Sequence, residues 1–375
     1  MRPRFFDLVF TPAVSAEQAR RGPRAGYAVI ATGGDATAEA IGEREVAFTA
    51  ARGPARRRRL EYLPVSLFGS VMGLTGLSVA WRYAALGYGA PHWLAGTIGA
   101  AAVAAFVALM LGYAVKLATA PDAAWAEFRH PIAGNLFGTF LVSLLLMPII
   151  LAPVSRLLAQ VVWATGAIGM LAFAWMIISR WMSDRQQIAH ATPAWIVPVV
   201  GVLDVPLALP ALGLPALHGV MVVGVAVGLF FAVPLFTLIF SRLVFEPPMP
   251  ESLQPTLLIL VAPFAVGFSA YVATTGQVDL FARSLYVLAL FMLAVLIGRL
   301  RFLDRTCPFR VSWWAVSFPL AASAIAALRF AAAEPGWITD AIAFVLLAIA
   351  TLTITGLLGR TLLGIARGEL RSMSA

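Results

Sequence analysis

Apolar stretches long enough to cross a lipid bilayer follow one another along most of the chain. An α-helix needs about 20 residues to span the hydrocarbon core. From Tyr62 onward, ten stretches of about that length alternate with short polar segments, and they are continuously apolar, which excludes a transmembrane β-barrel. The predicted spans are residues 62–86, 93–117, 131–152, 157–182, 193–213, 216–241, 253–275, 280–300, 309–330 and 337–361.

Prolines divide these ten segments into two kinds. Each odd-numbered segment has a proline at or near its start, and several carry a second, interior Gly or Pro, whereas Pro234 is the only interior proline of the even ones. A proline removes a helical hydrogen bond, and lipid cannot satisfy the freed backbone group. We therefore predict an all-α membrane protein of five helical hairpins, with odd, broken helices lining a central pore and even helices outside. The opening prolines are Pro64, Pro131, Pro193, Pro255 and Pro308.

The composition supports a membrane protein and offers no catalytic group. Hydrophobic residues make up 61% of the 375 positions and charged residues 12%, against about 45–50% and about 25% in soluble domains. A soluble enzyme and a disordered chain are therefore excluded. One cysteine, four scattered histidines and the lack of a nucleotide, hydrolase or metalloprotease motif predict no catalytic residues, no metal, no cofactor and no enzyme activity.

Basic residues are distributed unevenly between the two sides of the predicted bundle. With both termini in the cytoplasm, 23 Lys and Arg residues fall on cytoplasmic segments and 4 on the other side. Cytoplasmic loops of membrane proteins carry such an excess, which predicts a multi-pass protein of the inner (plasma) membrane with cytoplasmic termini. The same asymmetry explains the net charge of +9, so we expect no nucleic-acid partner.

The composition changes at the first predicted span. Residues 1–60 contain 11 Arg and no spanning segment, and the run Arg56–Arg59 suits the anionic inner leaflet. We interpret 1–60 as a basic, disordered cytoplasmic extension, or as the result of a misassigned start codon. Residues 61–365 then form the transmembrane domain, and 366–375 a short cytoplasmic tail.

Several short segments, in this order, resemble one known family. The first predicted span begins Pro64-Val-Ser-Leu-Phe-Gly-Ser, the third follows His130-Pro131, and the fifth opens with Thr192-Pro193. The seventh contains Ala262-Pro263, and the ninth reads Ser312-Trp-Trp-Ala-Val-Ser-Phe-Pro319. Over about residues 62–365 the chain thus resembles the tellurite-resistance/dicarboxylate transporter family of bacterial TehA and the plant slow anion channel. The resemblance implies ten helices around a pore and a homotrimer.

The resemblance also implies a pore gate. In the family a phenylalanine of the ninth helix plugs the pore, and Phe318 stands at that place. Further candidates come from the odd segments, although any single polar residue there is equally explained by helix packing. The candidate pore-lining residues are Phe68, Gly69, Gly73, Asn135, Gly201, Asp204, Pro263, Ser269 and Ser317.

Asp204 departs from the family pattern, which has a neutral residue near that place. A charge at the bilayer centre costs at least about 2.5–3.5 kcal/mol, so Asp204 faces the bundle interior or is protonated. A fixed carboxylate would repel anions, whereas a protonated one would allow proton coupling. The structural alternative is a hydrogen bond to a carbonyl freed by Pro206 or Pro210.

Two charged positions near segment ends have local interpretations. Asp279 and Arg283 are four residues apart, which predicts a surface ion pair. Glu127 precedes the third span, where a carboxylate offsets the positive end of the helix dipole.

Three functions remain open at this stage. The first is an anion channel for small inorganic anions such as chloride, nitrate, tellurite or sulfite. The second is a proton-coupled carrier of C4-dicarboxylates or sulfite that uses Asp204 as its proton site. The third is a membrane scaffold without transport. The first two make small anions, and all three make membrane lipids, the expected partners.

Overall fold

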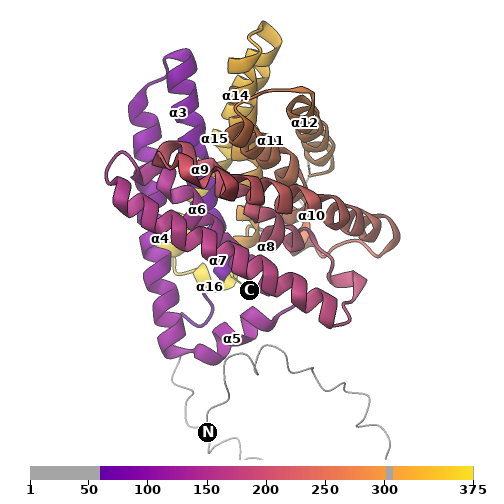
Figure 1. Cartoon of the computed structure of the whole chain (residues 1–375). Coiled ribbons are helices and arrows are strands. Elements are labelled where there is room, and N and C mark those ends of the chain that lie inside the picture. Colours follow the sequence, from indigo (N-terminus) through magenta and orange to yellow (C-terminus); the bar gives the residue numbers. More distant parts are fainter. Residues whose placement is uncertain (1–59, 301–306, 375) are drawn as a thin grey trace, which may run out of the picture. The chain divides into compact units, whose positions relative to one another are not determined.

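The computed structural model describes residues 60–300 and 307–374, and within these ranges every regular element is a helix. Figure 1 shows these helices along the chain. The predicted all-α class is confirmed. The predicted basic extension, including Arg56–Arg59, lies outside the described residues except for Leu60.

Five elements, here called the inner elements, lie where the odd segments were predicted. Each starts as a 3₁₀-helix (η) and continues as an α-helix. They are η2 (Val65–Leu67) with α3 (Phe68–Tyr88); η3 (Ala133–Phe137) with α6 (Gly138–Leu151); η5 (Pro193–Ile196), α8 (Val197–Val200), η6 (Gly201–Asp204) and α9 (Val205–Leu212); η8 (Glu251–Val261) with α11 (Ala262–Thr275); and η9 (Val311–Val316) with α14 (Ser317–Ala333).

Five long α-helices, here called the outer helices, alternate with the inner elements along the chain. They occupy the predicted even segments. Among the described residues, no 3₁₀ segment of more than three residues directly precedes any of them. They are α4 (His92–Thr119), α7 (Arg156–Ser183), α10 (His218–Phe245), α12 (Leu280–Leu300) and α15 (Trp337–Ala366). Short connecting or terminal elements are α5 (Pro121–Arg129), η4 (Ile188–His190), η7 (Pro215–Leu217) and α16 (Leu370–Met373).

Burial separates the two sets as the proline pattern predicts. In the most apolar stretch of four inner elements, 61–78% of residues are buried, against 17–39% in the outer helices. Most of α3, in the remaining inner element, is buried as well. Large apolar side chains of the outer helices are exposed, among them Trp175, Phe230, Phe291 and Leu352. Such surfaces suit contact with lipid.

The number of candidate spans in the described residues is one lower than the number predicted from the sequence. Within the described residues, nine helices are long and apolar enough to cross a membrane, and each matches one of the predicted spans 2–10. The first predicted span is also helical over Phe68–Tyr88, but it is not among the nine. The count of ten therefore stays a prediction.

The breaks predicted from prolines take a specific form. Pro198, Pro206 and Pro263 lie in the first turn of α8, α9 and α11, directly after a 3₁₀ segment, and Pro319 is the third residue of α14. A proline is tolerated in a first turn, because the N–H groups there have no partner within the helix. These prolines therefore mark junctions between 3₁₀- and α-helix; only Pro148 and Pro210 lie deeper inside an inner α-helix.

A buried ion pair holds the start of the first inner element. Lys116 Nζ of α4 lies 2.6 Å from Glu127 Oε2 of α5 and also donates to the carbonyl oxygen of Leu63 at 2.7 Å. Glu127 Oε1 accepts from the Val65 amide at 2.7 Å, and Tyr113 donates to Oε2. The Glu127 carboxylate thus lies at the start of the first inner element, and not of the third predicted span as its place in the sequence suggested.

The predicted surface pair between Asp279 and Arg283 is also wrong. Arg283 pairs with Glu334, which precedes α15. The Asp279 carboxylate instead accepts from the Ala282 amide at 3.0 Å and from the Tyr271 hydroxyl at 2.6 Å. Asp279 therefore caps the first turn of α12.

Candidate functional site

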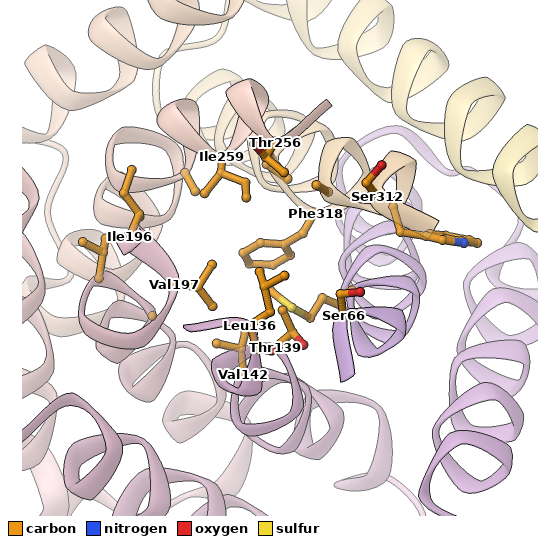
Figure 2. A pocket seen from close by; sticks show the side chains of 18 of the residues that line it. Ser66, Leu136, Thr139, Val142, Ile196, Val197, Thr256, Ile259, Ser312 and Phe318 are labelled. Carbon is orange, nitrogen blue, oxygen red and sulfur yellow. Dashed lines mark hydrogen bonds between the residues drawn. The ribbon is translucent and has the colours of Figure 1, made fainter. Parts of the chain in front are cut away.

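A cavity of about 120 Å³ lies between the inner elements. All five contribute to its wall, mostly from the 3₁₀ segments and the first α-helical turns after them. Figure 2 shows the cavity from close by. Its lining residues are Ser66, Gly69 and Met72; Leu136, Thr139 and Val142; Ile196, Val197, Val200, Gly201 and Asp204; Leu253, Thr256, Ile259, Ala262 and Val266; and Val311, Ser312, Trp314, Ala315, Phe318 and Pro319.

The lining residues recur every three positions. The series 66, 69 and 72, the series 136, 139 and 142, and the series 312, 315 and 318 each follow this spacing, and 253, 256, 259 and 262 extend it in η8. A 3₁₀-helix has three residues per turn, so residues three apart lie on the same face. In η8 and η9 the 3₁₀-helix thus presents a straight row of side chains to the cavity, whereas in the first two inner elements the spacing continues into α3 and α6.

The cavity wall is mostly apolar, with a few polar side chains from different elements. Ser66, Thr139, Thr256 and Ser312 supply one hydroxyl each from four inner elements, and Asp204 supplies a carboxyl from the fifth. Among the lining residues Asp204 is the only titratable one. Within the described part of the chain, Ser312 Oγ and Asp204 Oδ1 have no hydrogen-bond partner.

Phe318 reaches into this cavity. Figure 2 shows its ring in the space that Leu136, Val197 and Thr256 surround. The side chain is 8% exposed, and it stands in the first turn of α14, directly before Pro319. A phenyl ring at this position fills space that all five inner elements share.

Four of the sequence-predicted residues line the cavity: Gly69, Gly201, Asp204 and Phe318. Phe68 and Asn135 lie elsewhere. The Phe68 ring packs against those of Phe106 and Phe140, at centroid distances of 6.1 and 5.1 Å. The Asn135 amide donates to the carbonyl oxygen of Pro131 at 2.8 Å.

The other four predicted residues are also outside the cavity lining. Gly73 and Ser317 face each other between α3 and α14, where a Cβ on Gly73 would collide with the serine. Pro263 is in the first turn of α11. Ser269 is buried, its Oγ has no partner in the described residues, and its carbonyl oxygen accepts from Arg329 at 2.9 Å.

Reasoning from the sequence missed Thr256 and the aliphatic side chains that line the cavity. Thr256 Oγ1 donates to the Leu253 carbonyl oxygen at 2.6 Å, so its polar atom is satisfied within η8. The signal that points to it is the three-residue spacing from Leu253 to Ala262. In residues 60–300 and 307–374, no group of three or more His, Cys, Asp or Glu side chains is placed to hold a metal ion.

Comparison with known proteins agrees with this architecture. Residues 62–362 match the model of the SLAC1 family, described as voltage-dependent anion channel. The chain is 28% identical over 308 residues to the S-type anion channel SLAH3 of Arabidopsis thaliana, covering 80% of this chain and 48% of that protein. The match to SLAH2 of the same plant covers 59% of that protein, so the chain spans about half the length of these relatives.

Microbial proteins are similar over comparable regions. The tellurite resistance protein TehA homolog of Haemophilus influenzae is 26% identical over 275 residues, or 72% of this chain and 81% of that protein. An uncharacterized transporter of Methanocaldococcus jannaschii is 27% identical over 238 residues, or 57% of this chain and 69% of that protein. Because the family match covers nearly the whole described helical part, the chain belongs to the SLAC1 family of voltage-dependent anion channels.

Proposed function

We propose that the chain is an anion channel of the TehA and slow-anion-channel type, in which the cavity is part of the permeation path and Phe318 closes it. The observation that carries this proposal is the convergence of all five inner elements on a cavity that holds the Phe318 ring. Membership of the voltage-dependent anion channel family, and the names of the plant relatives, support anions as the cargo.

The physical basis of closure is dehydration. An anion that passes an apolar ring in a narrow path loses water and gains no partner, which costs several kcal/mol or more. Each 1.4 kcal/mol of barrier lowers permeation about tenfold where that barrier limits the flux. With the ring removed, the cavity would still present hydroxyl side chains, among them Ser66 and Ser312, to a hydrated anion.

The test is anion flux into liposomes that contain the purified protein. Phe318→Ala should raise chloride or nitrate flux at least about tenfold, and Phe318→Leu should give an intermediate value. Phe291→Ala is the matched control, because Phe291 is 63% exposed on outer helix α12, and its flux should equal that of the parent. Folded Phe318→Ala protein with parental flux would place the gate elsewhere.

The cargo we propose is a small inorganic anion, with tellurite and sulfite as specific candidates. The small cavity suits few-atom anions better than long organic ones. We further propose a homotrimer in the inner (plasma) membrane, as the resemblance implies. Replacing chloride by nitrate, sulfite or tellurite in the Phe318→Ala flux assay would rank the cargoes.

A second candidate function is a proton-coupled carrier of C4-dicarboxylates or sulfite. Asp204 favours it, because this carboxyl is 2% exposed, lines the cavity and has an oxygen without a partner in the described residues. A neutral carboxyl can donate a hydrogen bond to an anion, whereas its ionised form repels one. An anion would then cross together with a proton.

Two measurements separate the candidates. Single-channel currents in Phe318→Ala would support the channel, and saturating flux without such events would support the carrier. Asp204→Asn should raise flux at neutral pH and flatten its dependence on pH if Asp204 controls passage. Identical flux of parent and Asp204→Asn at every pH would assign Asp204 a structural role and remove the main support for the carrier.

A further inference from the structure

A second cavity, of about 320 Å³, lies where the last inner element begins and α15 ends. Its wall includes Phe309 and Arg310 before η9, Arg360 and Arg367 at the end of α15, and Glu369 and Ser372 beyond it. The cavity is separate from the one that holds Phe318, because the two share no lining residue.

The chain after α15 folds back to form one wall. Gly368 has φ +71°, a left-handed conformation that suits glycine, and it turns the chain into α16. Met373 of α16 then packs on Gly364, where a Cβ would lie 2.5 Å from Met373 Cε. The amide of Glu369 donates to the Gly364 carbonyl oxygen at 2.8 Å. The wall is therefore held by packing and by a backbone hydrogen bond.

The cavity gathers positive charge. Three arginines and one glutamate line it. Within the described residues, Arg360 and Arg367 form no ion pair, and both are exposed. The Arg360 guanidinium lies over the Phe309 ring, 5.5 Å from its centroid, which restricts its position. A guanidinium group can donate two parallel hydrogen bonds to two oxygens of one phosphate. This arrangement of arginines therefore suits a phosphate group.

The position along α15 indicates the source of that phosphate. Helix α15 has 30 residues and is about 45 Å long, which exceeds the hydrocarbon thickness of about 30 Å. The apolar run of α15 ends at Arg360, so we place the turns from Arg360 to Ala366 at the layer of lipid headgroups. Basic pockets between membrane helices on the cytoplasmic side are known to hold anionic headgroups.

We propose that this cavity binds the phosphate group of an anionic phospholipid through Arg360 and Arg367. The proposal goes beyond anion transport, since it assigns a lipid site outside the permeation path. The residues Pro308 to Arg310 lead directly into η9, whose Ser312 and Ala315 line the first cavity. A lipid bound here would contact the residues directly before the inner element that carries Phe318.

The test measures lipid binding to the full-length protein in detergent by native mass spectrometry. The probes are dioleoyl-phosphatidylglycerol, dioleoyl-phosphatidylcholine and inorganic phosphate. The parent should bind phosphatidylglycerol at least about tenfold more tightly than phosphatidylcholine, and Arg360→Gln/Arg367→Gln should lose this preference. Arg360→Lys/Arg367→Lys, which keeps the charge without the guanidinium fork, should be intermediate.

The matched control is Arg185→Gln/Arg299→Gln, which removes the same charge from exposed positions on the same predicted side. It should keep the parental preference. An unchanged preference in Arg360→Gln/Arg367→Gln, or an equal loss in the control, would overturn the proposal. Binding of inorganic phosphate without binding of phosphatidylglycerol would overturn the assignment to lipid. Because flux is not measured, the result is independent of the proposed channel function.

Discussion

Ser317 of α14 packs directly onto Gly73 of α3. A Cβ atom on Gly73 would lie 2.3 Å from Ser317 Oγ and 2.5 Å from Ser317 Cβ. The Ser317 hydroxyl donates to the carbonyl oxygens of Trp314 at 2.6 Å and Gly69 at 3.2 Å. Because Phe318 is the next residue, this contact sets the height and rotation of the proposed gate relative to the first inner element.

Gly73→Ala should therefore destabilise the protein. The added methyl group cannot be accommodated without separating α3 from α14, and overpacking of this kind costs about 1–3 kcal/mol. A lower midpoint of thermal unfolding in detergent is the expected result. Gly356→Ala in α15 is the control, because a Cβ there meets no atom within 4 Å and alanine favours a helix. Equal midpoints for the two variants would show that α3 and α14 accommodate the added methyl group without loss of stability.

Breaking the ion pair at the start of the first inner element should lower the free energy of unfolding. Lys116 and Glu127 have side chains that are 4% and 13% exposed, so removal of one partner leaves a largely buried charge. Lys116→Met should cost about 3–5 kcal/mol, seen as a lower unfolding midpoint. Lys116→Met/Glu127→Gln should recover part of that loss, because no buried charge then stays unpaired. A double variant as unstable as the sum of both single ones would contradict this account.

Asp279 should make stability depend on pH in the acid range. The hydrogen bonds from the Ala282 amide and the Tyr271 hydroxyl lower the pKa of the Asp279 carboxyl below its usual 3.8. A lowered folded-state pKa gives stability that is complete above about pH 4 and is lost as the pH falls through the folded-state pKa. Asp279→Ala should lower the unfolding midpoint at pH 7, and by progressively less as the pH falls below about 4.

A matched aspartate tests whether this effect belongs to the helix cap. Asp184→Ala removes an exposed carboxyl that follows α7 and makes no side-chain hydrogen bond among the described residues. Its midpoint should equal that of the parent over the same pH range. If Asp279→Ala and Asp184→Ala behave alike, the Asp279 hydrogen bonds do not contribute to stability in solution.

The charge asymmetry predicts the topology, and cysteine labelling can measure it. The single cysteine, Cys307, is 2% exposed, and a Cys307→Ala background removes it. A membrane-impermeant maleimide should label Gln277→Cys in intact cells and should label Arg185→Cys only after permeabilisation. The reverse pattern would invert the orientation.

The sequence predicted the inner and outer sets of helices because their difference rests on a local rule. Pro148 and Pro210 each remove a hydrogen bond inside an inner α-helix, and the freed backbone group has to be satisfied within the protein because lipid cannot satisfy it. Such prolines therefore indicate burial. Phe318 and Asp204, which line the cavity, were candidates for two other reasons. Phe318 was chosen through resemblance, and Asp204 because a carboxyl in an apolar segment faces the interior or is protonated.

Other features depend on contacts that no local pattern contains. In the first inner element Ser66, Gly69 and Met72 line the cavity, whereas the Phe68 ring packs on those of Phe106 and Phe140. The partner of Arg283 is 51 positions away, and the pairing of the only lysine, Lys116, joins two separate helices. Tertiary packing determines these partners and the residues that face the cavity.

The 3₁₀ starts have a mechanical consequence. A residue rises about 2.0 Å in a 3₁₀-helix and about 1.5 Å in an α-helix, so the 11 residues of η8 span about 22 Å instead of about 16.5 Å. Conversion of η8 to an α-helix would shorten it by about 5.5 Å and turn its side chains about the axis. Thr256 and Ile259 would then no longer share one face. A change of η8 between the two helix types would therefore alter the length of this element and the lining of the cavity together.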